Sequence, residues 1–453
     1  MEDWLPWSTI CLKLQNKMES PFPGDRILVL DGAMGTMLQK HGLTGPGQVN
    51  NLTAPEVVAS IHREYIDAGA DIIETNTFSG GYETSLAGAR IARGVADAAP
   101  RKILVAGSVG PTTKSLSICS DYDHPDARAV SFDEMAASYR EQIRGLLEGG
   151  VDMLLLETCF DALNAKAAIY AWNDLGGKVP VMVSGTFSDA GGRLLTGQTL
   201  EAFYTSVLHC APAAFGLNCG LGAEKMLPLI KEVGGFAGCP VICYPNAGMP
   251  DGRGNYTQTP GEMAEEVGKL ADTGIISIVG GCCGTTPDHI RAIAERVRNI
   301  RPSNRPESGD CMRLSGLEAF SFSGGELQVC AATDSILNPE FAKMIGDDDY
   351  DSAMCLASEA LCSGFDILDI NMDAVGARNR EAMGKFVRYI MLDPSISRAA
   401  LMIESSDAGT VIEGLKNAQG RCLACCSGPF NGATLEKSFG AVVADAGSVR
   451  KII

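Results

Sequence analysis

The sequence predicts an α/β protein with a (β/α)8 (TIM) barrel first, then a linker and a truncated second α/β unit. Between residues 26 and 298, a short apolar run, a polar or glycine cluster and a helix-period segment follow one another repeatedly. Each apolar run is continuous rather than alternating, as expected for strands buried on both faces. Eight such units in this length have the size and rhythm of a barrel. The runs are residues 27–36, 71–78, 103–111, 152–159, 179–187, 213–220, 241–248 and 276–284.

The alternative is a doubly wound open sheet, and two observations argue against it. An open sheet would carry a GxGxxG phosphate turn after its first strand, and residues 31–36, DGAMGT, do not fit that pattern. In addition, unusual polar residues stand at the carboxyl ends of the runs, which share one rim in a barrel, where active sites are built. They are Asp31, Glu74, Ser108, Glu157, Asn218, Cys219, Asn246, Cys282 and Cys283.

The segments between and after the runs set the expected domain organisation. Helix-like stretches include residues 54–68, 132–148 and 287–299, and Pro287 suits a first helical turn. We expect an N-terminal extension over 1–25, the barrel over 26–300, a proline-bearing linker over 301–326 and a second α/β unit over 327–453. That last unit is roughly half as long as a complete barrel, so we expect it to be partial.

Composition narrows the class of protein. The chain has 453 residues and a formal net charge of −18, which argues against nucleic acid or an anionic membrane as a partner. No apolar run has the length of a membrane span, and the first 25 residues lack the core of a signal peptide. Sixteen cysteines in such a chain indicate reduced thiols, some of them metal ligands. These features favour a cytoplasmic enzyme.

Cys219, Cys282 and Cys283 form the most specific pattern. They end the sixth and eighth runs, so a barrel brings them to one rim, and catalytic zinc commonly takes three protein ligands. Adjacent cysteines on a regular strand point to opposite faces, so joint ligation requires the backbone to turn there. Nearby glycines, including Gly284, permit such a turn. The alternative is that these cysteines are small buried hydrophobic residues.

Other residues at the expected rim could bind a ligand, and for most of them a purely structural role is the alternative. Asp31 and Glu157 are acids at strand ends that would suit a ligand's ammonium group, or else form caps or rim ion pairs. The backbone N–H groups of Ala33 and Met34 start a helix and would suit a carboxylate. Asn246 is either a turn residue or a further metal ligand.

Seven separated motifs resemble the homocysteine S-methyltransferase family, in the version found at the N-terminus of cobalamin-dependent methionine synthases. Residues 311–320 and 364–373 are similar to the linker and to part of the pterin-binding (folate) barrel that follows in those enzymes. The seven motifs are DGAMGT (31–36), ETNTF (74–78), GSVGP (107–111), LLETC (155–159), GLNCGLG (216–222), PNAG (245–248) and GGCCGTTPDHI (280–290).

The resemblance implies roles for these residues. Cys219, Cys282 and Cys283 correspond to the three zinc thiolates, through which the reaction is catalysed, and Asn246 to a position that approaches the metal. Asp31, Ser108, Glu157 and the backbone of Ala33 and Met34 correspond to the pocket for the amino and carboxylate groups of homocysteine. The expected reaction is attack of the homocysteine sulfur on an activated methyl group, a step of methionine biosynthesis. A free thiol has a pKa of about 8.5. Zinc would make it the nucleophile.

The methyl donor is left open by the residues. The methionine synthase family takes methyl from methylcobalamin on a module with a D-x-H-x-x-G motif, and that motif does not occur here. We therefore expect a corrinoid-binding protein to act in trans. Betaine, S-methylmethionine or another small donor is the alternative, and a non-catalytic zinc-binding scaffold is a third.

The pterin-like segment departs from its family at three positions. The family's G-E-R-T-N falls on residues 330–334, CAATD, which lack the glutamate and the arginine. Its D-S-S falls on residues 404–406, ESS, and its V-N-S on residues 424–426, ACC. A pterin needs several convergent polar groups, so we expect this partial domain not to bind folate by itself.

Overall fold

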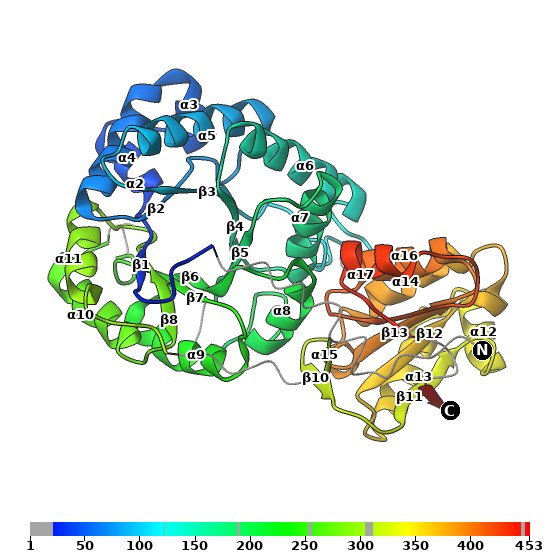
Figure 1. Ribbon diagram of the computed structural model, residues 1–453. Coiled ribbons are helices and arrows are strands. Elements are labelled where there is room, and N and C mark those ends of the chain that lie inside the picture. The colour runs from blue at the N-terminus through cyan, green and yellow to red at the C-terminus, as the bar shows by residue number, and fades with distance from the viewer. Residues whose placement is uncertain (1–20, 122, 188–190, 252–255, 304–310, 445–448) are drawn as a thin grey trace.

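The computed structural model describes residues 21–121, 123–187, 191–251, 256–303, 311–444 and 449–453. Figure 1 shows two α/β units side by side, a ring of strands enclosed by helices and a smaller sheet covered by helices of its own. Among the described residues, no helix is both long and apolar enough to cross a bilayer.

The larger unit is a closed parallel barrel, as the sequence predicted. Its strand order is β1-β8-β7-β6-β5-β4-β3-β2, every neighbouring pair is parallel, and a bridge between Leu30 and Ile72 joins the first strand to the second. The strands are β1 (Leu28–Val29), β2 (Ile72–Glu74), β3 (Leu104–Val109), β4 (Met153–Cys159), β5 (Val181–Gly185), β6 (Ala214–Gly222), β7 (Val241–Asn246) and β8 (Ile276–Val279).

The helices of the barrel begin where the sequence offers caps. Ser131 and Glu134 cap α6 reciprocally, Thr259 and Glu262 do the same for α10, and α11 begins at Pro287. The helices are α2 (Met34–Lys40), α3 (Asn50–Thr53), α4 (Pro55–Ala68), α5 (Tyr82–Asp97), α6 (Phe132–Glu148), α7 (Ala162–Asp174), α8 (Leu200–Val207), α9 (Ala223–Phe236), α10 (Pro260–Ala271) and α11 (Pro287–Val297), with 3-10 turns η1 (Gly47–Val49) and η2 (Leu208–Cys210).

Strand β4 shows why the runs are continuously apolar. Met153 and Leu155 pack with the side chains that fill the barrel interior, while Leu154 and Leu156 pack with those between strands and helices. Because successive strand residues point to opposite faces and both faces are buried, each position is apolar until the strand reaches the rim.

The smaller unit contains a partial parallel sheet with the order β15-β14-β13-β12-β11-β16. Its strands are β11 (Leu327–Asp334), β12 (Ile367–Asn371), β13 (Ala400–Ser405), β14 (Leu423–Cys426), β15 (Val442–Val443) and β16 (Val449–Ile452). Its helices are α12 (Pro339–Gly346), α13 (Tyr350–Leu361), α14 (Asn379–Ile390), α15 (Pro394–Ser397), α16 (Ala408–Asn417) and α17 (Gly432–Phe439), with a 3-10 turn η3 (Asp373–Val375). The truncated second α/β unit expected from the sequence is therefore present.

Part of the segment that the sequence predicts as a linker is ordered as an antiparallel hairpin, β9 (Met312–Ser315) with β10 (Ala319–Phe322). Met312 and Leu314 are buried among Val329, Ile367 and Met402 of the sheet. The hairpin thus covers one face of the partial barrel with apolar side chains, which alternate along the strand as a half-buried hairpin requires.

The two units are packed against each other through helices on the second unit's side of the barrel (Figure 1). Lys166 of α7 is 1% exposed, and its Nζ donates to the carbonyls of Ala418 and Gly420, each at 2.9 Å. Phe439 of α17 packs against the ring of Phe132, with ring centroids 6.1 Å apart. A buried lysine satisfied by carbonyls of the other unit ties the two units together.

Candidate metal and substrate site

Three thiols meet at the carboxyl rim of the barrel. The sulfur atoms of Cys219, at the end of β6, and of Cys282 and Cys283, after β8, all lie within 4.8 Å of one another. The end of β7 braces the cysteine pair, because the Cys282 N–H donates to the Pro245 carbonyl at 2.8 Å. The structure therefore brings together the three cysteines that the sequence singled out.

The backbone leaves regular strand geometry at the cluster, as joint ligation requires. Cys219 has φ 57° and Gly284 has φ 81°, both in the left-handed region. A Cβ on Gly284 would overlap the Cβ of Tyr256, and one on Gly281 would overlap Thr285. Glycine is therefore needed at both positions for the turn that aims two adjacent cysteines at one point.

The three sulfurs share charge unequally. Hydrogen bonds from Cys282 and Cys283 lower the pKa of Cys219, while the same bonds raise the pKa of Cys282 and that of Cys283. One thiolate is thus held by two neighbouring thiols, because three thiolates this close would repel one another. A cation at the centre would allow all three to ionise.

Beside the thiols, inside the mouth of the barrel, lies a group of three acids. Asp31 is 2% exposed and Glu157 5% exposed, and Glu74 is half-buried beside them. Both carboxylate oxygens of Asp31 accept from the Glu74 N–H at 3.1 Å, and the Ser108 hydroxyl donates to Glu157. Burial raises the pKa of Glu157 to about 7 and the pKa values of Asp31 and Glu74 well above their usual range. A cationic ligand would complement this group.

Ala33 and Met34 lie at the start of α2, close to the loop that carries the cysteine pair. The Ala33 N–H donates to the Thr285 hydroxyl at 3.0 Å, and the Ala33 carbonyl accepts from the Tyr65 hydroxyl at 3.0 Å. In this conformation the Ala33 N–H is therefore engaged within the protein. Met34 is the first residue of the helix.

Asn246, at the end of β7, touches the thiol cluster from two sides. Its Oδ1 accepts from the Cys283 N–H at 3.1 Å, and its side chain also hydrogen-bonds Cys219. The structure thus places every predicted site residue on one rim of the barrel.

Sequence reasoning missed three residues of the site. Glu74 and Asn218 were recognised as polar strand ends, but neither was included among the site residues. Asn218 is fully buried next to Cys219, and its Nδ2 lies 4.0 Å from the Cys282 sulfur. Tyr256, which hydrogen-bonds the Cys283 sulfur, belongs to a loop without a recognisable signal. For Glu74 and Asn218 the signal was their position at the carboxyl ends of strands.

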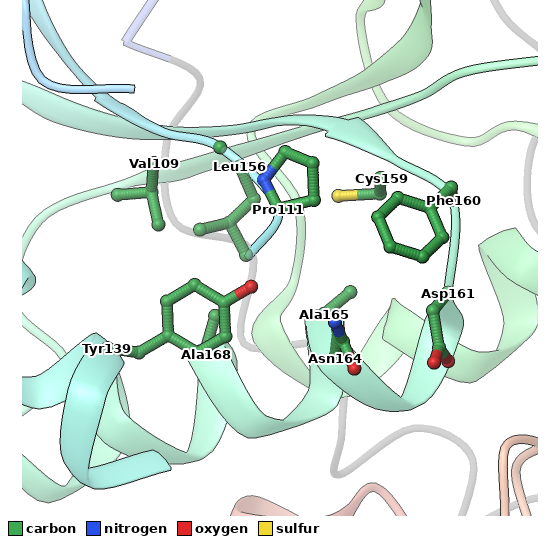
Figure 2. A pocket seen from close by; sticks show the side chains of 11 residues that line it. Val109, Pro111, Tyr139, Leu156, Cys159, Phe160, Asp161, Asn164, Ala165 and Ala168 are labelled. Atoms are coloured by element: carbon green, nitrogen blue, oxygen red, sulfur yellow. The ribbon is translucent and has the colours of Figure 1, made fainter. Parts of the chain in front are cut away.

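Figure 2 shows a separate cavity on the helix side of β3 and β4, and it is not part of this site. Its volume is about 10 Å³, and its lining includes Val109, Tyr139, Leu156, Cys159 and Ala168. A space of this size holds at most one water molecule and is mostly apolar, so it reads as a packing void. Cys159 lies there and not among the thiols of the rim.

A barrel with clustered thiols and buried acids on its carboxyl rim has the arrangement of an enzyme active site with ligands for a metal ion. The family model for homocysteine S-methyltransferase matches residues 28–297, which is more than half of the chain. The chain therefore belongs to the homocysteine S-methyltransferase family. It is a methyltransferase of a family whose substrate is homocysteine.

Solved structures of a homocysteine methyltransferase are similar to this chain in fold. The apo form of the homocysteine methyltransferase MmuM from Escherichia coli is 25% identical, with a TM-score of 0.50, over 62% of this chain and 100% of that chain. Its metallated form is 24% identical with the same TM-score, over 60% of this chain and 96% of that chain. Its oxidized form is 23% identical with the same TM-score, over 63% of this chain and 99% of that chain.

Proposed function

We propose that this chain makes methionine by transferring a methyl group to homocysteine, with zinc held by Cys219, Cys282 and Cys283. The supporting observation is that the three sulfurs converge within 4.8 Å beside the group of buried acids. Three thiolates suit zinc and leave a fourth position open for substrate. The pKa values of Cys282 and Cys283 are raised mainly because both thiols hydrogen-bond Cys219, and a divalent cation at the cluster would favour the loss of their protons.

When bound, zinc would supply a Lewis acid that favours loss of the homocysteine thiol proton and keeps the sulfur electron-rich. The residues of the chain then orient the rest of the substrate. We propose that Glu157 and Asp31 receive the ammonium group, with Ser108 holding the Glu157 carboxylate in place. An arriving ammonium would drive off the proton that burial holds on Glu157. Asn246 is a candidate fourth ligand when substrate is absent.

For the substrate carboxylate we propose the N-terminal turn of α2, with Met34 as its first residue and Ala33 before it. The unpaired N–H groups of a helix start favour an anion. Since the Ala33 N–H now donates to Thr285, its use would require that bond to be exchanged for one to the substrate. The whole pocket lies within residues 26–300, which we propose as the catalytic barrel.

As methyl donor we propose methylcobalamin carried by a separate corrinoid-binding protein. This proposal is supported by the resemblance to cobalamin-dependent methionine synthases, which continues past the barrel into the second unit. A small donor such as betaine or S-methylmethionine is the second candidate. One comparison favours this candidate. The Escherichia coli homocysteine methyltransferase aligns over its whole length with 62% of this chain, and the barrel alone is long enough to account for that match.

We propose that the second unit is a degenerate pterin-like domain that does not bind folate alone. In support, three acids on its strands are already engaged. The Lys451 ammonium lies 2.7 Å from Asp334, 2.9 Å from Asp369 and 2.5 Å from Glu404. Cys425 and Cys426 stand where the family has a more polar pair. A ligand would have to displace this lysine.

The test is methionine formation by the purified zinc-loaded protein from homocysteine and one donor at a time. The donors are methylcobalamin, betaine and S-methylmethionine, with Cys283→Ser as the inactive control. Turnover with methylcobalamin supports the corrinoid proposal, and turnover with a small donor replaces it with the alternative. Absence of methionine with every donor, in protein that contains zinc, would contradict the proposed activity.

A further inference from the structure

Each of the three clustered sulfurs has its own hydrogen-bond donor from the protein. The Tyr256 hydroxyl donates to Cys283, and the Asn218 amide approaches Cys282 with its Nδ2 4.0 Å from the sulfur. Cys219 receives bonds from the Gly220 N–H and from the Asn246 side chain. The donors come from β6, from the end of β7 and from the loop that follows β7, so they are not a by-product of one turn.

The Asn218 amide is held in one orientation. Its Oδ1 accepts from the Thr158 N–H at 2.9 Å and from the Ser184 hydroxyl at 2.7 Å. Its Nδ2 donates to the Thr158 hydroxyl at 2.7 Å and faces the Cys282 sulfur. Because two donors already point at the oxygen, the amide cannot be flipped without leaving both unsatisfied.

Asn246 and Tyr256 are fixed as well. The Oδ1 of Asn246 accepts from the Cys283 N–H at 3.1 Å, which turns its Nδ2 toward Cys219. Tyr256 is packed on the backbone of Gly284, so closely that any side chain there would overlap it. These donors are therefore preorganised around the sulfurs before any ligand binds.

The proposed reaction, on which this inference rests, poses a selectivity problem. Four sulfurs would surround the metal, three from the protein and one from homocysteine, and one of them must take the methyl group. Alkylation uses a sulfur lone pair to form the S–C bond, while the bond from carbon to the donor breaks and its electron pair leaves with the donor. A methylated cysteine would become a neutral thioether, a poorer zinc ligand than a thiolate.

We propose that Tyr256, Asn218 and Asn246 are positioning residues that protect the protein's own thiolates from methylation. A sulfur that accepts a hydrogen bond spreads part of its negative charge onto the donor, so its lone pair attacks carbon more slowly. The homocysteine sulfur is then the most reactive of the four. Tyr256 is the residue to test first, because phenylalanine keeps the ring on Gly284 and removes only the hydroxyl.

The experiment follows alkylation of each cysteine in the zinc-loaded full chain, without substrate. The probe is iodoacetamide, which forms an S–C bond as the C–I bond breaks and iodide leaves. Peptide mass spectrometry gives a rate for each site, and a chromophoric chelator reports released zinc. In Tyr256→Phe we expect Cys283 to react about fivefold faster, as loss of one hydrogen bond of ordinary strength implies. Cys219 and Cys282 should keep their rates, and Tyr389→Phe, in the second unit, should behave as wild type.

Asn218→Asp is the second variant, since it keeps an acceptor for Thr158 and Ser184 and removes the donor that faces Cys282. Here the rate should rise at Cys282 alone. Unchanged rates in Tyr256→Phe, or an equal rise at all three cysteines, would overturn the proposal, because an equal rise indicates only a more open site. Failure of the proposed function is seen separately, as a wild-type protein that holds no zinc.

Discussion

The hydroxyl of Ser108 donates a hydrogen bond to the carboxylate of Glu157, and both residues are buried at the carboxyl ends of adjacent strands, β3 and β4. The pair shows how the site is organised, since the acid proposed to read the substrate's ammonium group is oriented by the neighbouring strand. Burial raises the pKa of Glu157, and the hydrogen bond from Ser108 keeps its carboxylate oriented.

Replacing Glu157 with glutamine should weaken homocysteine binding and leave the metal in place. The amide keeps an oxygen for the Ser108 hydroxyl but has no charge for an ammonium group, so we expect a loss of about 10- to 100-fold in affinity. Calorimetry on zinc-loaded protein measures it. Glu224→Gln, an exposed acid on α9, is the matched control. Equal affinity in Glu157→Gln and wild type would make Glu157 a structural acid.

The same variant should be more stable than wild type at high pH. Burial raises the pKa of Glu157 from 4.5 to about 7, so its protonated form is favoured in the folded state. That contribution is complete below pH 4.5 and is lost as pH rises through 7, at most about 3 kcal/mol. Thermal unfolding of both proteins from pH 5 to 8 should therefore show a difference in stability that grows with pH. A difference that is constant across that range would show that Glu157 ionises normally.

Each of the variants Cys219→Ala, Cys282→Ala and Cys283→Ala should lose most of its zinc, because the described structure offers no fourth thiol at the cluster to replace one. The metal content of protein purified under reducing conditions measures this. Cys159→Ala is the control, since that cysteine lines the small cavity behind β4 and should not affect zinc. Circular dichroism should show an intact barrel in all four. Full zinc retention in the three rim variants would refute the assignment.

Lys451→Met should destabilise the second unit. The lysine ammonium neutralises Asp334, Asp369 and Glu404, and without it these carboxylates repel one another in a poorly solvated place. Removing one partner of a buried ion cluster costs about 3–5 kcal/mol. Urea unfolding at pH 8 should show this loss, and Lys451→Arg should recover most of it. Near pH 5 the loss should shrink, because the pKa of Asp369 is raised to about 7 by burial and its proton replaces the lost charge. A loss of equal size at both values of pH would contradict this account.

Methyltetrahydrofolate should show no saturable binding to the chain by itself at micromolar concentration. The inner acids of the partial barrel are paired with Lys451, and Ala331, Ala332 and Cys425 stand at positions that align with polar residues of the pterin-binding family. Equilibrium dialysis with labelled folate tests this directly, with Lys451→Met as a second sample. Micromolar binding to the unmodified chain would mean that the second unit has a working folate site.

The sequence by itself determined the barrel, the rim and the three thiols. Continuous apolar runs such as residues 153–156 indicate burial on both faces, and the polar residue that ends each run marks the rim. These are local signals, because the period of a strand and the point where it ends can be read from neighbouring residues. The motifs around Cys219 and Cys282 then indicated the family.

Only the tertiary structure decided which groups meet. Tyr256 reaches Cys283 from another loop, Glu74 joins Glu157 across the mouth of the barrel, and Lys451 meets Asp369 from a strand far along the chain. Such contacts depend on the stagger of the strands and on left-handed turns at residues such as Cys219. No periodicity in the sequence encodes these contacts. A hydrogen bond between two loops depends on where the packed helices and strands place the two loops, and not on the residues next to the donor or the acceptor.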